Sequence, residues 1–129
     1  MRISVWVDNW QMQCCGDPFA VGHEVSWTLQ DADDEWLANI LGDDAARGVT
    51  KAEEHHGGVP DDAPATTGRV AAIKAVHHRY APKPGDDPRA RYVVPGSGVV
   101  TTIESADGWT PDQGELSFAG YIVDLDVET

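Results

Sequence analysis

Two adjacent cysteines, Cys14 and Cys15, are the residues whose types most directly suggest chemistry in this chain. Neighbouring side chains in an extended segment point to opposite faces, so both thiols reach one metal ion, or each other, only where the backbone turns. Gly16 follows them and permits such a turn. The functional alternatives are a redox-sensing or metal-binding dithiol, a vicinal disulfide and a single nucleophile. Asp17 disfavours a thiolate there, and a structural role for both cysteines fits the same residues.

The run Glu53, Glu54, His55 and His56 is the second candidate site. A carboxylate beside an imidazole can perform acid-base chemistry near neutral pH, although a solvated polar loop has the same composition. Zinc prefers about four nitrogen or sulfur ligands, and none of the cysteines and histidines shows the spacing that lets one rigid element present two ligands. We therefore predict no cofactor, and keep zinc as an alternative, with the possible ligands Cys14, Cys15, His55 and His56.

Tryptophans concentrate near the N-terminus, where Trp6, Trp10 and Trp27 account for three of the five in the chain. Exposed aromatic residues beside polar loops are typical of binding patches. We predict a binding or regulatory module that recognises a protein or small ligand around Trp6 and Trp10, with a thiol- or metal-dependent protein as the alternative. The full set of candidate binding residues is Trp6, Trp10, Cys14, Cys15, His55 and His56.

The charge is strongly negative, with a formal net charge of −13. Such a chain repels phosphate backbones, which disfavours nucleic-acid and anionic-membrane binding. The basic segment 69–91 is the exception and provides a third hypothesis, an anion or single-strand nucleic-acid site. No apolar run is long enough to cross a bilayer and no leader is evident, so we expect a cytoplasmic protein, either a monomer or a homodimer.

Hydrophobic periodicity predicts the elements that must position these residues. In residues 2–8, Ile3, Val5 and Val7 alternate with Trp6 and Asp8, so Trp6 must be covered by a second layer or by a partner. A helix is expected from Asp33 to Leu41 because its apolar residues fall on one face behind an acidic first turn. The remaining strands are expected at 25–29, 68–80, 91–95, 99–105 and 116–127.

Three connecting segments complete the prediction. Residues 9–17 show no periodicity and are expected to be irregular, and residues 43–67 are expected to form a long polar loop. Gly96-Ser97-Gly98 is expected to connect 91–95 and 99–105 as a hairpin. The predicted fold is mainly β: residues 1–129 form a single β-rich domain, a small β-barrel or half-open sandwich of about six strands with one short helix.

Four segments together resemble a known family. They are VWVDNWQMQCCGDPF, VGHEVSW, the EEHHGG run and the closing GYIVDL. On these segments the chain is similar, over most of its length, to a family of short actinobacterial proteins of unknown function. The WQMQCCG run is the most specific part. The resemblance implies a cytoplasmic origin and carries no activity, cofactor or catalytic residue.

Overall fold

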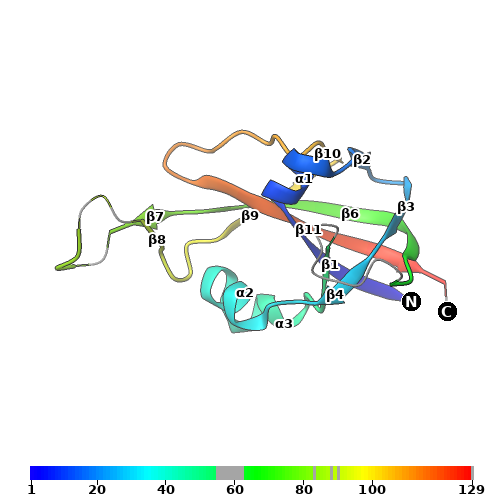
Figure 1. Ribbon diagram of the computed structural model, residues 1–129, viewed down its shortest axis with the longest axis horizontal. Helices are drawn as coiled ribbons and strands as arrows, with labels where there is room; N and C mark the ends of the chain where they lie inside the picture. The colour runs from blue at the N-terminus through cyan, green and yellow to red at the C-terminus, as the bar shows by residue number, and fades with distance from the viewer. Residues whose placement is uncertain (55–62, 83, 88, 90, 129) are drawn as a thin grey trace.

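Seven strands form one curled sheet in the computed structural model, which describes residues 1–54, 63–82, 84–87, 89 and 91–128 (Figure 1). Two further ladders of short strands flank it. The strands of the sheet are β1 (Arg2–Asp8), β3 (Glu24–Trp27), β4 (Leu29–Asp31), β5 (Lys51–Glu53), β6 (Thr66–His78), β9 (Val99–Ile103) and β11 (Ser117–Val127). The ladders pair β2 (Phe19–Ala20) with β10 (Ser105–Ala106), and β7 (Tyr80–Ala81) with β8 (Tyr92–Val93).

The sheet is ordered β3-β6-β11-β1-β5-β4, with β9 paired to β6 outside this path. Its centre is antiparallel: β11 lies between β6 and β1, so that Trp6 is opposite Ile122 and Asp8 is opposite Gly120. β5 joins β1 in parallel. The central strands carry apolar residues on both faces because each face is covered, which confirms the interpretation of residues 68–80 as a central strand.

A single residue, Thr28, closes the curl. It joins β3 to β4, and these two strands stand at opposite ends of the strand order. The two ends of the path must therefore approach each other, and the sheet bends into a half-open barrel. The carbonyl of Thr28 accepts a hydrogen bond from Glu54 N at 2.9 Å. The predicted mainly β, half-open architecture is confirmed, while the single strand expected over 25–29 is divided between the two ends.

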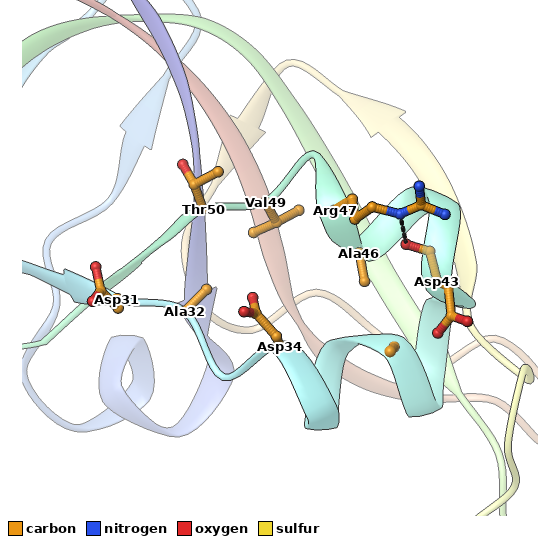
Figure 2. A pocket seen from close by; sticks show the side chains of 9 residues that line it. Asp31, Ala32, Asp34, Asp43, Ala46, Arg47, Val49 and Thr50 are labelled. Atoms are coloured by element: carbon orange, nitrogen blue, oxygen red, sulfur yellow. Dashed lines mark hydrogen bonds between the residues drawn. The ribbon is translucent and has the colours of Figure 1, made fainter.

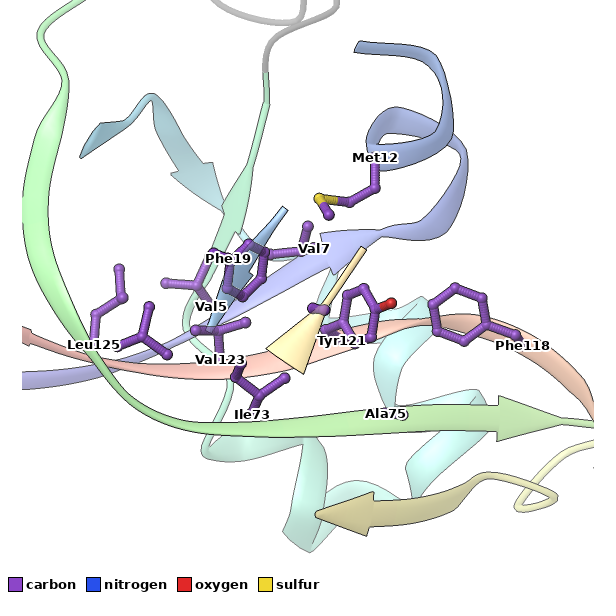
Figure 3. Close-up of a cluster of buried hydrophobic side chains, with 12 residues drawn as sticks. Val5, Val7, Met12, Phe19, Ile73, Ala75, Phe118, Tyr121, Val123 and Leu125 are labelled. Atoms are coloured by element: carbon purple, nitrogen blue, oxygen red, sulfur yellow. The ribbon is translucent and has the colours of Figure 1, made fainter. Parts of the chain in front are cut away.

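The inner face of the curl holds the first hydrophobic core (Figure 3). Most of its side chains come from β1, β6 and β11, and the Tyr121 ring packs against Phe19 of β2 with a centroid separation of 6.2 Å. Helix α1 (Asn9–Cys15) covers this core with Met12. The core residues are Val5, Val7, Met12, Phe19, Val70, Ile73, Ala75, Ala106, Phe118, Tyr121, Val123 and Leu125.

A second core lies on the outer face, beneath helices α2 (Asp34–Leu41) and α3 (Asp43–Arg47) (Figure 1). Leu37 and Ile40 of α2 are each 1% exposed and pack with Trp6, which shows that a second layer covers this tryptophan. Asp33 caps α2, as its carboxylate accepts a hydrogen bond from Trp36 N at 3.1 Å. The predicted helix from Asp33 to Leu41 is therefore confirmed, with Asp33 as its cap.

Several local predictions were wrong. Residues 9–15 are helical, because α1 docks its Met12 side on the core although its sequence is largely polar. The predicted long loop 43–67 contains α3 and β5; its residues 55–62 lie outside the described part of the chain. Gly16 has φ −84°, so it supplies no left-handed turn. It instead leaves space for Met12, whose Cα would lie 2.8 Å from a Cβ at this position.

The expected hairpin around Gly96-Ser97-Gly98 does not form. β8 pairs with β7 and β9 pairs with β6, so the two flanking segments belong to different ladders. The backbone N–H groups of Gly96 and Gly98 donate to Asn39 O and Ile40 O at 2.8 and 3.0 Å. This connection therefore satisfies carbonyls at the end of α2, which would otherwise lack partners within the helix.

Candidate functional site

Two hollows lie beside α2, and they differ in chemistry. The first, of about 670 Å³, is lined by Ala32, Ala46 and Val49 with acidic residues around them (Figure 2). Its charged residues are exposed, and two of them have partners: Arg47 donates to the backbone O of Asp43 at 3.4 Å, and Asp31 binds Lys51 at 2.8 Å. This hollow is a junction between helices without aromatic residues in its walls.

The second hollow, of about 540 Å³, gathers aromatic residues from six elements, and we call it the tryptophan pocket. It lies where the ends of β1 and β6 meet the start of α1 and α2. Three of its walls are the indoles of Trp6, Trp10 and Trp36. The complete lining is Trp6, Asp8, Asn9, Trp10, Gln30, Asp31, Asp33, Trp36, Leu37, Ala52, His78, Tyr80, Phe118 and Ala119.

Strand alternation places Trp6 and Asp8 on the same face of β1, the face turned toward α2. Trp6 is 4% exposed, and its Nε1 donates a hydrogen bond to Asp8 Oδ1 at 2.8 Å. Gly120 makes room for the indole, because a Cβ there would lie 2.7 Å from Trp6 Cζ2 and 2.5 Å from Val7 O. The Trp6 ring is thus held by its strand, by its carboxylate partner and by a glycine on β11.

Trp10 stands in the first turn of α1 and is 51% exposed. Its helix is fixed to the sheet by Asn9, whose Nδ2 donates to Phe118 O at 2.9 Å. The Oδ1 of Asn9 accepts a hydrogen bond from Trp10 N at 2.8 Å. The exposed indole of Trp10 therefore lies at the rim of the pocket, on a helix whose first turn is fixed by hydrogen bonds.

Four rings form a continuous wall in edge-to-face contact. Trp6 and Trp36 have centroids 5.1 Å apart, Trp36 and His78 6.5 Å, and His78 and Tyr80 4.6 Å. Their planes are inclined by 61°, 67° and 68°, in the range that the aromatic quadrupole favours. Tyr80 is 44% exposed and ends this wall at the surface.

Two titratable groups inside the pocket, Asp8 and His78, have shifted pKa values. Burial raises the pKa of Asp8, and the nearby Glu54 carboxylate raises it further, while hydrogen bonds from the Trp6 and Trp10 side chains act in the opposite sense. Burial, and then the neighbouring His77, lower the pKa of His78. His78 is 2% exposed, and its Nδ1 has no hydrogen-bond partner in the described part of the chain.

The predicted site residues do not come together in one place. Trp6 and Trp10 both line the tryptophan pocket, whereas Cys14 is exposed at the end of α1 and is not among its walls. His55, His56 and the Cys15 side chain lie outside what the structure describes. Among the described residues, no group of three histidine, cysteine or acidic side chains is arranged to hold a metal ion.

Sequence reasoning missed Asp8, Trp36, His78 and Tyr80 as parts of the site. The first could have been found, since the alternation that places Trp6 on the outer face places Asp8 there as well. The others come from α2 and from the β6–β7 end, and no local pattern links them to β1. The pairing of β6 with β11, and of β11 with β1, brings the end of β6 beside β1, and the packing of α2 on the outer face adds Trp36.

The fold and the site define a class: a small curled β domain whose outer face carries an aromatic, acidic pocket of ligand size. Within that class, the chain belongs to a family of unknown function, DUF6578, whose model matches residues 1–127. The family resemblance predicted from the sequence is therefore confirmed. Comparisons with curated proteins and with solved structures found no match. None of the helices in the described ranges is long and apolar enough to cross a membrane.

Proposed function

We propose that this protein is a binding module that accepts a small ligand in the tryptophan pocket. The observation that carries the proposal is the gathering of Trp6, Trp10 and Trp36, from three separate elements, around one hollow of about 540 Å³. Pockets for small molecules commonly measure roughly 300–1,000 Å³ and combine aromatic walls with a few polar groups. Asp8, Asn9 and Gln30 supply such groups here.

The exposure of Trp10 and Tyr80 supports a binding role. Both stand at the mouth of the pocket with 51% and 44% of their surface exposed, whereas Trp6 and His78 are buried and Trp36 is half-buried. Tryptophan and tyrosine contribute a large share of binding energy where they are covered by a partner. A ligand that enters the pocket would cover these two rings.

The other predicted functions have less support. The thiol or zinc alternative needs convergent ligands, and Cys14 lies outside the pocket. The nucleic-acid hypothesis needs a continuous basic face, but Arg69 lies near the start of β6 and Arg79 just after its end, about 30 Å apart at the usual rise of a strand. Arg69 donates to Gly22 O at 3.0 Å, and Arg89 pairs with Asp87 at 3.1 Å.

The test is a small-molecule screen followed through the indole N–H signals of ¹⁵N-labelled protein. Ligands of the pocket should shift the signals of Trp6, Trp10 and Trp36 and leave that of Trp109 unchanged, because Trp109 is not in its lining. Trp10→Ala should abolish the shifts. Trp109→Ala is the matched control, since this indole is 66% exposed and its loss should leave binding intact. Compounds that bind while leaving all three pocket indoles unshifted would contradict the proposal.

A further inference from the structure

The charged residues that line the tryptophan pocket are acidic. The inference drawn from them rests on the proposed function and extends it to the class of ligand. Asp8, Asp31 and Asp33 contribute carboxylates, whereas neither lysine nor arginine occurs among the lining residues. The chain as a whole carries a net charge of −13. The field at the pocket therefore attracts cations and repels anions.

The three carboxylates are not equivalent. Asp31 is neutralised by Lys51 at 2.8 Å, and Asp33 accepts the hydrogen bond that caps α2. Asp8 is the partly buried one, and the hydrogen bond from Trp6 Nε1 fixes its Oδ1 at the base of the wall. Since that bond comes from a neutral donor, the negative charge of Asp8 is not cancelled by a cation of the protein.

The aromatic walls provide the second element of cation recognition. The faces of indole and phenol rings carry negative potential, and tryptophan attracts cations most strongly of the aromatic residues. His78 adds an imidazole ring to the wall and, because burial lowers its pKa, adds no positive charge at neutral pH. Any cation in the pocket thus meets aromatic rings and carboxylates without a competing positive group among the lining residues.

The kind of cation follows from what the pocket lacks. A metal ion needs several converging ligands, and the described residues contain no group of three or more histidine, cysteine or acidic side chains arranged to hold one. A simple ammonium is strongly hydrated and seeks several hydrogen-bond acceptors. A methylated ammonium has lost those donors, carries its charge on an apolar surface, and is the group that aromatic cages recognise.

We propose that the tryptophan pocket binds a trimethylammonium group, with the indoles of Trp10 and Trp36 and the carboxylate of Asp8 as its main contacts. The same group occurs in small free compounds such as choline and on trimethylated lysine side chains. Both sources present identical chemistry to the pocket, and they are separated by experiment.

The experiment titrates ¹⁵N-labelled protein with choline, with 3,3-dimethylbutanol and with a short trimethyllysine peptide. Dimethylbutanol has the shape of choline without its charge, so a cation site should bind it about tenfold or more weakly than choline. Asp8→Asn should remove most of that preference and retain the weak binding of dimethylbutanol. If the peptide binds more tightly than choline, the source is a protein side chain; the reverse order indicates a free compound.

The possible failures are distinct. Equal binding of choline and dimethylbutanol would overturn the cation inference while supporting a ligand pocket. The same holds if choline fails to bind and other compounds in the screen shift the three pocket indoles. If no compound of any charge shifts them, the proposed function fails as well. The comparison of choline with dimethylbutanol uses the unaltered protein, so it remains decisive even if Asp8→Asn does not fold.

Discussion

Trp6 Nε1 donates a hydrogen bond to Asp8 Oδ1 at 2.8 Å, and the two residues share the outer face of β1. This bond links the second core to the pocket, because Trp6 is packed beneath α2 while Asp8 lines the hollow. One strand thus supplies both a structural side chain and the charge that we assign to ligand binding. The predictions below separate these roles.

Asp8→Asn is expected to stabilise the protein at neutral pH. Because the folded-state pKa of Asp8 is raised above 3.8 by burial, its contribution to stability is fully present below that value and is lost as pH rises through the folded-state pKa. The asparagine carbonyl can still accept from Trp6. Denaturant unfolding at several pH values should show the advantage of Asp8→Asn growing from acid toward neutral pH, and a constant difference would contradict it.

Trp6→Ala should destabilise the fold, whereas Trp10→Ala should leave the fold stable and remove ligand binding. Trp6 is 4% exposed, so its truncation leaves a cavity between the sheet and α2, and the expected loss is about 3–5 kcal/mol. Trp10 is 51% exposed, so its truncation should change the free energy of unfolding by less than about 1 kcal/mol while it abolishes ligand binding. Chemical denaturation measures the free energy of unfolding of both variants, and Trp109→Ala serves as the exposed control.

Gly120→Ala should destabilise the protein because the added methyl group meets the Trp6 ring and Val7 O within 2.7 Å. Overpacking of this kind costs about 1–3 kcal/mol. The matched control is Gly48→Ala, where a Cβ would have no neighbour closer than 3.7 Å. If both variants unfold at the same denaturant concentration as the wild type, Gly120 is not required for the position of Trp6.

His78→Phe should make the protein less sensitive to mild acid. Burial lowers the folded-state pKa of His78 below 6.5, so its contribution to stability is present above 6.5 and is lost as pH falls toward the folded-state value. Asp8 acts in the opposite direction at lower pH, and the variant should therefore be compared directly with the wild type. The free energy of unfolding of His78→Phe minus that of the wild type should increase as the pH falls from about 7.5 to about 5.5. Parallel curves would show that His78 does not titrate differently on folding.

Local periodicity was sufficient for the elements that carry their own pattern. β1, β6, β11 and α2 were predicted because alternating or helical spacing of apolar residues is a property of each segment alone. Helix α1 was missed because its turn is stabilised by docking of Met12 rather than by an amphipathic pattern. β5 was missed because three residues contain too little pattern to distinguish a strand from a loop.

Pairing could not be predicted in the same way. The segments around Gly96-Ser97-Gly98 have the composition of a hairpin. The backbone N–H groups of this connection instead donate hydrogen bonds to the carbonyls at the end of α2. The choice depends on the position of α2, which is distant in the sequence. The composition of the turn therefore indicated that the chain reverses direction, but it did not indicate which strands the two flanking segments pair with.

By itself, the sequence determined a mainly β domain, the course of its central strands, a capped helix and the family to which the chain belongs. Only the tertiary structure decided which tryptophans share a pocket. Trp6, Trp10 and Trp36 meet because α1 follows β1 directly and α2 packs on the outer face of the sheet, where its Leu37 and Ile40 join Trp6 in the second core. Contacts of this kind form between segments that are distant in the sequence, so no local spacing predicts them. The Cys14–Cys15 pair, conspicuous in the sequence, lies at the end of α1, whereas the first residues of this helix line the pocket.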